Sequence, residues 1–376
     1  MRVQIVDPPA YTPPYDRSLC AALARGGAEV ELVTSRFAHG SVPPAEGYRV
    51  SEVFYRRSAE RAAGVTGRRA LKLAEHLADM LRYRRDGGRA DVVHYQWLPV
   101  PALDSRLLPG GRPRVLTAHG LLREEAWRGR PGRGLRRLWR RMDAIVTLSE
   151  YGARRLRDEA EMEAERIHVI PHGALDYLTR IPDEAPLPDE LAAVEGPVIL
   201  CFGLIRPYKG VDVLLEAFRS VQGAELWVVG RPLGMSLQPL REEAARAPGR
   251  VRFVPRFLPD REVPAYFRRA DLVVLPHRDA EQSGVLYAAL AFGKPIAMSA
   301  VGGFPEVAEH GAGRLVPPGD PQALAGAVNE LLADAAARER LAAAARAAAA
   351  GPYSWDAVGE RTLALYRELI GNRVPG

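Results

Sequence analysis

Short runs of β-branched and apolar residues alternate with helical patterns, and this whole alternation occurs twice along the chain. In the first half, the strand-like runs lie at 3–7, 30–35, 91–96, 114–119, 143–149 and 167–173. In the second half, they lie at 197–203, 224–230, 251–255, 270–276, 295–300 and 313–319. Strands that alternate with helices predict a mostly parallel, doubly wound sheet, because parallel neighbours need a crossover connection. The sequence therefore predicts two doubly wound α/β domains in tandem.

A proline-rich stretch, IPDEAPLPDE at 181–190, separates the two alternations and is typical of an interdomain linker. We expect an N-terminal domain at 1–178, a linker at 179–195 and a C-terminal domain at 196–353. Residues 354–376 contain a further helical pattern with a serine in the N-cap position. We expect this helix to cross back onto the N-terminal domain.

The composition is that of a globular protein, with 47% hydrophobic and 26% charged residues. No run approaches the ~20 apolar residues that span a bilayer, and MRVQIVDPPA lacks a signal-peptide pattern, so we expect a cytoplasmic protein. Cys20 and Cys201 cannot make a disulfide framework or a four-cysteine metal site. The sequence has no Walker loop, no G-x-G-x-x-G after the first strand and no D-x-D. We therefore expect neither a resident cofactor nor a required metal.

The net charge of +6 is distributed unevenly. Residues 1–180 hold 31 Lys and Arg against 22 Asp and Glu, and residues 56–141 alone hold 21 against 8. Such a surplus predicts an anionic neighbour, which is a nucleic acid, a membrane surface or a phosphorylated ligand. Because no nucleic-acid recognition motif accompanies it, we do not expect a nucleic acid as partner.

One part of this basic region has tryptophans and leucines among its arginines. Trp127, Leu135, Leu138 and Trp139 lie within REEAWRGRPGRGLRRLWRRM at 123–142. The composition resembles an interfacial segment that docks peripherally on an anionic membrane. A solvated arginine-rich helix beside a loop has the same composition, and the sequence leaves both interpretations open.

The segment FGLIRPYKGVDVLLEAF at 202–218 contains one of only three lysines among the 52 basic residues. We expect a strand to end at Gly203 and a helix to begin near Val211, which places Arg206 and Lys209 in the connecting loop. A compact ammonium with three donors suits a bridging phosphate oxygen, whereas a guanidinium prefers a planar partner. Both side chains are therefore candidate phosphate ligands, and a solvated loop lysine is the alternative.

The segment PHRDAEQSGVLYAALAFGKP at 276–295 predicts a second phosphate-binding element. A helix is expected to open near Ser283, so the backbone N–H groups of Ser283, Gly284 and Val285 would bind an anion at the positive end of its dipole. Glu281 lies in the loop before this helix. Opposite the lysine loop, the element predicts a site for a diphosphate.

Two further residues have both structural and functional interpretations. His119, in TAHG, follows a strand-like run, so it either binds a ligand at the strand end or has a structural role. Lys294 precedes a strand, and we expect it to be structural.

Taken together, these segments resemble the retaining glycosyltransferases of family 4, whose GT-B fold has two Rossmann-like domains facing across a cleft. The second half carries the likeness in FGLIRPYKGVDVLLEAF, VRFVPRFLPDREVPAYFRRADLVVLP and ALAFGKPIAMSAVGGFPEVAEHGAGRLVPPGD. The first half carries it in LTAHG, TLSEYGARRL and VIPHGAL. The resemblance implies metal-independent transfer of a sugar from a nucleotide-diphosphate-sugar to an unidentified small-molecule, glycan or lipid-linked acceptor. It also implies retention by same-face displacement, in which the leaving phosphate takes the acceptor proton.

The resemblance assigns roles to residues of this chain. Arg206 and Lys209 match the pair that neutralises the donor diphosphate, and His119 matches a histidine near the reacting centre. The segment around Arg256 and Phe257 resembles the edge that binds the base. The catalytic residues are expected to be His119, Arg206, Lys209 and Glu281. The donor-binding residues are expected to be Arg206, Lys209, Arg256, Phe257, Glu281, Ser283, Gly284 and Val285.

The chain departs from the family pattern at its acidic residues. The two glutamates that the family places eight positions apart fall on Ala280 and Ala288. We hypothesise that Glu281 replaces the first, which contacts the sugar hydroxyls, and that the ribose contact is weakened or rebuilt.

A second departure affects the acceptor side. The loop PPAYTPPYD at 8–16 lacks the glycine pair that the family has there, so Tyr11 and Thr12 are candidates for a sugar or acceptor pocket. Gln96 and Trp97, after the strand-like run at 91–96, are further acceptor-pocket candidates.

Three alternatives to a working transferase stay open. A homologue with a degenerate, inactive donor site would have lost the two glutamates. A protein that binds anionic surfaces would account for the basic region but not for the second domain. A nucleotide-sugar epimerase of the same fold would need an acid–base set that the sequence does not supply.

Overall fold

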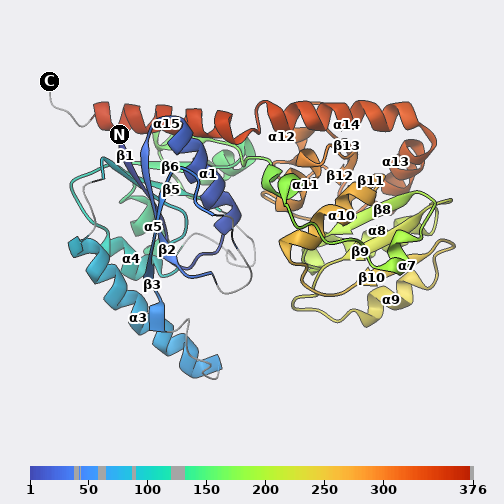
Figure 1. Cartoon of the computed structure of the whole chain (residues 1–376), viewed down its shortest axis with the longest axis horizontal. Helices are drawn as coiled ribbons and strands as arrows, with labels where there is room; N and C mark the ends of the chain where they lie inside the picture. The colour runs from blue at the N-terminus through green and yellow to red at the C-terminus, as the bar shows by residue number, and fades with distance from the viewer. Residues whose placement is uncertain (38–41, 43, 58–64, 87–89, 120–131, 373–376) are drawn as a thin grey trace. The chain divides into compact units, whose positions relative to one another are not determined.

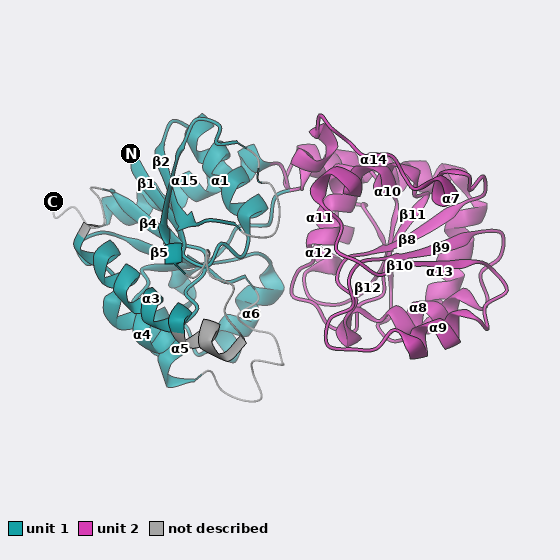
Figure 2. Ribbon diagram, turned by 60° about the horizontal axis from the view of Figure 1, so that its bottom comes forward, with its two compact units in different colours: residues 1–173, 355–376 teal, residues 174–354 magenta. Residues whose placement is uncertain are grey.

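The computed structural model describes residues 1–37, 42, 44–57, 65–86, 90–119 and 132–372. These residues form two compact units, which are coloured separately in Figure 2. Unit 1 comprises residues 1–173 with 355–376, and unit 2 comprises residues 174–354. Each unit has its own parallel sheet, so the prediction of two α/β domains is confirmed.

Unit 1 is built on a seven-stranded parallel sheet with the order β3-β2-β1-β4-β5-β6-β7 (Figure 1). Its strands are β1 (Arg2–Asp7), β2 (Glu29–Ser35), β3 (Arg49–Phe54), β4 (Val92–Tyr95), β5 (Arg114–Thr117), β6 (Ala144–Thr147) and β7 (Ile167–Val169). Its helices are α1 (Pro13–Arg25), α3 (Val65–Asp86), α4 (Pro101–Leu107), α5 (Arg133–Trp139), α6 (Glu150–Asp158), α15 (Trp355–Gly371) and the 3-10 turn η1 (Ala164–Arg166). The strand order reverses between β1 and β4, and ligands of open parallel sheets bind at such a switch point.

The last helix, α15, packs against α1 in unit 1 (Figures 1 and 2). The two helices approach closely at Gly359, where an added Cβ would lie 3.0 Å from the Cβ of Ala22. Tyr366 of α15 is buried, and its hydroxyl is 2.6 Å from Nδ1 of His94 on β4. Unit 1 is therefore assembled from two separate stretches of sequence.

Unit 2 is built on a six-stranded parallel sheet with the order β10-β9-β8-β11-β12-β13. Its strands are β8 (Val198–Phe202), β9 (Glu225–Val229), β10 (Val251–Val254), β11 (Leu272–Leu275), β12 (Ile296–Ser299) and β13 (Arg314–Val316). Its helices are α7 (Asp189–Ala192), α8 (Val211–Phe218), α9 (Gln238–Ala244), α10 (Val263–Arg269), α11 (Gly284–Ala291), α12 (Phe304–Ala308), α13 (Pro321–Ala333) and α14 (Ala335–Ala350). Its 3-10 turns are η2 (Asp176–Arg180), η3 (Pro207–Lys209) and η4 (Asp260–Glu262). Its strands carry near-continuous apolar runs because helices cover both faces of the sheet.

The stretch that we expected to be a linker at 179–195 belongs to unit 2. Leu191, and Leu178 just before the stretch, are buried in the core of that unit. The backbone N–H of Ala185 donates to the carbonyl of Arg261 at 2.8 Å. Proline lacks a backbone N–H but does not prevent neighbouring side chains from packing. The buried leucines therefore attach this stretch to unit 2 despite its prolines.

Among the helices that the structure describes, none is both long enough and apolar enough to cross a bilayer.

Candidate active site

In unit 2, the predicted donor residues follow the carboxyl ends of the parallel strands, which lie at one edge of the sheet. Arg206 and Lys209 come after β8, whereas Glu281 and Ser283 come after β11. Since β8 and β11 are hydrogen-bonded neighbours, their loops lie side by side. The fold therefore brings together the loops after β8 and β11, which the sequence predicted separately as phosphate-binding segments.

Lys209 connects the two loops. Its Nζ lies 2.7 Å from Nε2 of His277 and donates to Oγ of Ser283 at 3.3 Å. Gly210, which follows it, has φ of 66°, and a Cβ there would lie 1.9 Å from the carbonyl oxygen of Pro276. The turn needs glycine for both reasons, and it holds the lysine loop against the end of β11.

His277 is a site residue that sequence reasoning missed. Its side chain is only 2% exposed, and burial, together with the neighbouring ammonium of Lys209, holds its pKa well below the usual value. The imidazole is therefore neutral, and its Nε2 accepts the proton that Lys209 donates. A polar residue immediately after a buried strand was the available signal.

Arg206 adds a second cation to the lysine loop. Its side chain is partly buried, and its Nε is shielded from solvent without a hydrogen-bond partner among the residues that the structure describes. A shielded donor without a partner costs about 1–3 kcal/mol, more for a charged group. An anion bound at this loop would satisfy it.

The amino terminus of α11 lies next to Lys209. Ser283 occupies the N-cap position, and the backbone N–H of Leu286 makes a first hydrogen bond to its carbonyl. The N–H groups of Gly284 and Val285 lie ahead of that bond, where a helix has unsatisfied donors. Gly284 is exposed, and a Cβ added there would meet Cδ1 of Leu175 at 4.0 Å, an ordinary contact distance.

Glu281 lies between these elements, and both of its carboxylate oxygens are shielded from solvent. Its carbonyl accepts the N–H of Gly303 at 3.1 Å. At Gly302, with φ of 55°, an added Cβ would lie 1.5 Å from the carbonyl oxygen of Ala280. The turn at Gly302 and Gly303 thus packs on the backbone of the Glu281 loop and holds it.

Arg256 and Phe257 follow β10, two strands away from β8 in the same sheet. Arg256 is exposed and forms an ion pair with Glu262, and the ring of Phe257 is 54% exposed. They lie at the same edge of the sheet as the lysine loop. An exposed aromatic ring at this edge is available for stacking.

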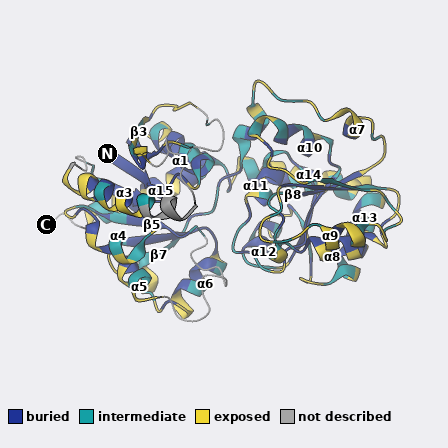
Figure 3. Ribbon diagram, turned by 90° about the horizontal axis from the view of Figure 1, so that it is seen from below, coloured by how far each residue is buried: buried dark blue, intermediate teal, exposed yellow. Residues whose placement is uncertain are grey.

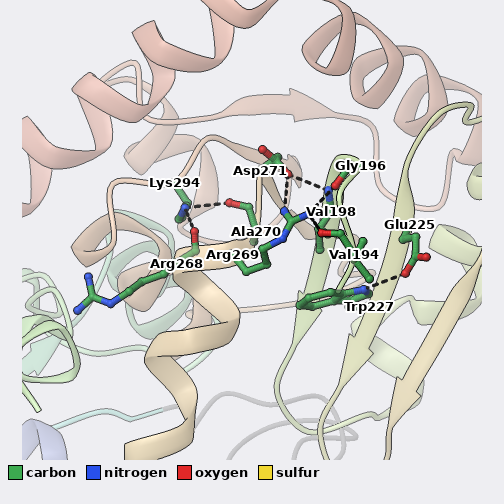
Figure 4. Close-up of polar contacts among 10 residues, drawn as sticks. All are labelled: Val194, Gly196, Val198, Glu225, Trp227, Arg268, Arg269, Ala270, Asp271 and Lys294. Atoms are coloured by element: carbon green, nitrogen blue, oxygen red, sulfur yellow. Dashed lines mark hydrogen bonds and ion pairs between the residues drawn. The ribbon is translucent and has the colours of Figure 1, made fainter. Parts of the chain in front are cut away.

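Lys294 has a structural role (Figure 4). Its Nζ donates to the backbone carbonyls of Arg268 and Ala270 at 2.9 and 2.8 Å. These carbonyls end helix α10 and would otherwise lack a partner. The structure thus separates the two lysines of unit 2, one at the candidate site and one in the framework.

In unit 1, five predicted residues form one cluster at the carboxyl ends of β1, β4 and β5: Tyr11, Thr12, Gln96, Trp97 and His119. Trp97 stacks on His119, with 5.3 Å between ring centroids, and its Nε1 donates to Oγ1 of Thr12 at 3.0 Å. Nε2 of His119 lies 2.7 Å from Oε1 of Gln96. Burial and the neighbouring His172 keep the pKa of His119 well below its usual value, so its ring is neutral.

Two residues of the cluster face a ligand in different ways. Gln96 is 1% exposed, and its Nε2 has no hydrogen-bond partner among the described residues. Tyr11 is 57% exposed and packs edge-on against Trp97. The cluster therefore offers a buried amide donor and an exposed aromatic ring.

Sequence reasoning also missed a buried carboxyl pair behind this cluster. Asp7, at the end of β1, accepts the N–H of Tyr11 at 2.8 Å, and Asp16 accepts the hydroxyl of Thr12 at 3.5 Å. Burial raises the pKa of Asp7 to about 6 and raises that of Asp16, with the negative charge of Asp7 adding to the effect on Asp16. The pair positions the loop that carries Tyr11 and Thr12.

The proposed membrane segment at 123–142 is not supported by the residues that can be located. Leu138 and Trp139 are each 1% exposed and belong to the core of unit 1. Leu135 is partly buried against the same core, and Trp127 lies outside the described residues. The apolar side of α5 packs on its own unit, because Leu156 and Met142 are available there as partners.

Comparison with known proteins identifies the family. Residues 17–174 match the model described as "Glycosyltransferase Family 4", and residues 196–334 match "Glycosyl transferases group 1". The D-inositol 3-phosphate glycosyltransferase of Xylanimonas cellulosilytica is 30% identical, over 96% of this chain and 92% of that protein. The chain belongs to the family 4, group 1 glycosyltransferases.

Other proteins similar to this family 4 glycosyltransferase include a GDP-mannose-dependent α-(1-6)-phosphatidylinositol monomannoside mannosyltransferase of Mycolicibacterium smegmatis. It is 29% identical over 70% of this chain and 71% of its own length. Among solved structures, HepE of Anabaena, in complex with UDP-glucose, superposes with a TM-score of 0.74 at 21% identity, covering 98% of this chain and 100% of HepE. The family 4 glycosyltransferase therefore has the GT-B fold, as predicted.

Proposed function

We propose that this family 4 glycosyltransferase moves a sugar from a nucleotide-diphosphate-sugar to an acceptor hydroxyl, with retention and without a metal ion. The observation that carries the proposal is the cationic edge of unit 2, where Lys209 contacts the N-cap residue of α11 and Arg206 lies in the same loop as Lys209. The UDP-glucose bound by HepE, which shares the fold, supports a nucleotide sugar as donor.

The chemistry places negative charge where these groups lie. The bond between the anomeric carbon and the diphosphate oxygen breaks, and charge develops on the leaving β-phosphate. Preorganised cations and helix-terminal N–H groups stabilise that charge most effectively in a site that excludes water. The acceptor oxygen bonds to the same face of the anomeric carbon, and its proton passes to the leaving phosphate oxygen. The atoms balance without a covalent sugar–enzyme intermediate.

The remaining donor contacts are assigned from position. The carboxylate of Glu281 accepts hydrogen bonds from hydroxyls of the transferred sugar. Glu281 lies in the loop between β11 and α11, and its carboxylate is shielded from solvent. Phe257, exposed at the end of β10, stacks on the base. Ala288 is 4% exposed within the core of unit 2 and contributes no polar contact, so the ribose is held by other groups.

The acceptor is bound by unit 1. Gln96 offers its buried Nε2 to a hydroxyl, and Trp97 and Tyr11 offer aromatic surfaces. To His119, which Gln96 and Trp97 hold, we assign the contact with the reacting sugar. Relatives that act on an inositol phosphate and on a phosphatidylinositol mannoside support a polyhydroxylated ring as acceptor.

Thermal shifts with UDP, GDP, ADP and dTDP and their sugars, in the presence of EDTA, test the donor site. A ligand that binds only the folded state raises the melting temperature, so we expect a shift with one base and none that depends on a metal. Proton NMR of the product formed with D-inositol 3-phosphate should then show the anomeric configuration of the donor. Silence across the whole panel would instead favour an inactive homologue.

We also propose that unit 1 contacts an anionic bilayer peripherally, through helix α3 in place of the segment at 123–142. Leu73, Leu77 and Leu81, spaced four residues apart, are 51%, 40% and 49% exposed. The inward side of the helix is mixed. Met80 and Tyr83 are buried in the core of unit 1. Nε2 of His76 lies 2.6 Å from Asp104, and Asp79 accepts the N–H of Tyr55. A surface helix normally keeps its large apolar residues on the buried side, so three exposed leucines in a row are unusual.

The charges on α3 select an anionic lipid surface as the partner. In the stretch 71–85, every exposed residue is apolar or an arginine. Figure 3 shows that exposed and buried positions alternate along α3. Arg82, Arg84 and Arg85 flank the leucines at one end. An interfacial helix inserts apolar side chains among the lipid headgroups and places its cations on the phosphates. Each cation adds about 1 kcal/mol to the binding free energy near an anionic surface.

Co-sedimentation with vesicles tests this surface. We expect binding to vesicles of phosphatidylglycerol and phosphatidylcholine, weaker binding at high salt, and loss of binding in a Leu77→Asp/Leu81→Asp variant. Leu233→Asp, at a 37% exposed leucine of unit 2, is the matched control and should bind normally. Equal binding of the α3 variant and the wild type would exclude α3 as the contact.

A further inference from the structure

We propose that His277 is a positioning residue for glycosyl transfer: its neutral imidazole orients the ammonium of Lys209 between the β8 and β11 loops before the donor binds. This inference rests on the proposed donor site.

The geometry fixes both partners. Nε2 of His277 lies 2.7 Å from Nζ of Lys209, and Ser283 receives a second donor of the same ammonium at 3.3 Å. Lysine has a flexible four-carbon stem, so an unrestrained ammonium would lose rotamer entropy when it meets a phosphate. Because the fold fixes two acceptors for the ammonium, most of the side-chain entropy of Lys209 is lost during folding. Less is then lost when the donor binds.

The imidazole is itself held in place. It is 2% exposed and lies edge-on to the ring of Phe304, with 5.1 Å between centroids. Since Nε2 accepts from Lys209, the proton of the neutral ring is on Nδ1. Burial and the packing on Phe304 restrict the ring, whereas its Nδ1 has no hydrogen-bond partner among the described residues.

The choice of histidine has an electrostatic consequence. A carboxylate in this position would also orient Lys209, but it would offset the positive charge that the diphosphate needs. Neutral imidazole orients the ammonium and leaves the net charge of the pair at +1. A histidine here therefore combines orientation with full cationic strength.

The next residue restrains the backbone of the same loop. The N–H of Arg278 donates to the carbonyl of Tyr208 at 2.8 Å, and its guanidinium binds both carboxylate oxygens of Asp212 at 2.5 and 2.6 Å. The ion pair is exposed and adds little by itself, whereas the backbone bond fixes the turn that precedes Lys209. His277 and Arg278 thus hold the side chain and the main chain of the lysine loop.

Calorimetric titration with UDP, GDP and ADP, using the full chain, tests the inference. In His277→Leu we expect ~10-fold or weaker affinity for the nucleoside diphosphate that binds the wild type, because one charge-assisted contact is no longer aimed. Affinity for the corresponding nucleoside, which has no phosphate, should not change. His277→Gln, whose amide oxygen can reach the position of Nε2, should recover most of the diphosphate affinity.

Controls separate this inference from stability and from the proposed function. His310→Leu, at an exposed histidine of unit 2, should leave both affinities unchanged, and melting temperatures of all variants show whether they are folded. Binding of a nucleoside diphosphate by the wild type with unchanged affinity in His277→Leu would overturn the role of His277 alone. Equal losses for nucleoside and nucleoside diphosphate, or no recovery in His277→Gln, would assign His277 a merely structural role. No binding of any nucleotide by the wild type would remove the proposed donor site itself.

Discussion

The indole of Trp97 lies nearly parallel to the imidazole of His119, with planes inclined by 16° and centroids 5.3 Å apart. Trp97 also donates to Thr12 at 3.0 Å, so one side chain connects the loops after β1, β4 and β5. We expect Trp97→Ala to lower transfer to the acceptor about tenfold or more, because the stack and the hydrogen bond are both lost. Donor hydrolysis in water and the affinity for nucleoside diphosphate should change little, since those groups belong to unit 2. Trp97→Phe keeps a ring, so its rate of transfer should lie between those of the wild type and Trp97→Ala. If Trp97→Ala lost transfer and donor binding equally, the division of roles between the two units would be contradicted.

Lys209→Ala should reduce turnover by about a hundredfold or more, since a preorganised cation is removed from the leaving phosphate. The melting temperature should stay close to that of the wild type, because the side chain is only partly buried. Steady-state kinetics with the donor identified by thermal shift provide the measurement. Near-normal activity would sink the assignment of this residue.

Lys294→Met is the matched lysine variant with the opposite expectation. It leaves the carbonyls of Arg268 and Ala270 without their donor, which costs about 1–3 kcal/mol of unfolding free energy. Urea denaturation should show this loss, while the affinity for nucleoside diphosphate is retained. If Lys294→Met were as stable as the wild type but failed to bind nucleotide, Lys294 would have to be assigned to the donor site.

Stability should depend on pH through Asp7 and Asp16. The pKa of Asp7 in the folded chain, about 6, lies above the ordinary 3.8 because burial disfavours the charged form. A raised pKa means that the stabilising contribution is present below about pH 4 and is lost as the pH rises through about 6.

Asp16→Asn removes one of the two buried carboxyl groups. The variant should therefore be more stable than the wild type, and its gain in unfolding free energy should be larger at pH 7.5 than at pH 4.5. The gain grows with pH because burial and the negative charge of Asp7 raise the pKa of Asp16 in the folded chain. Chemical denaturation at both pH values measures it, with the exposed Asp158→Asn as control. A parallel response of wild type and Asp16→Asn would show that the pair does not control the pH dependence.

The strands of both sheets were predictable because most are buried on both faces and so form continuous apolar runs. Strand β3 at Arg49–Phe54 was not predicted, since it lies at the sheet edge and Phe54 is its only fully buried residue. Its sequence, RVSEVF, has neither an apolar run nor a clean alternation.

The site was predictable only in part. The loop of Arg206 and Lys209 stood out because it carries a rare lysine after a strand, and the structure places Lys209 next to Ser283. His277 did not stand out, because its importance depends on β8 and β11 being neighbours, which the strand order decides and the local sequence does not. Trp139 was misjudged for the same reason: an apolar helix face looks alike whether its partner is a lipid or Leu156 of the same unit.

The division of unit 1 into two stretches has a consequence for biosynthesis. A ribosome completes Trp355–Gly371 only after all of unit 2 has been made, so α1 emerges without the helix that covers it. Unit 2 is a continuous stretch and can fold while the peptide is still growing. The nascent first half must therefore remain competent to fold, with the apolar side of α1 uncovered, until the last helix leaves the exit tunnel. Chaperone capture of stalled chains that end before Trp355 is the expected sign of this wait.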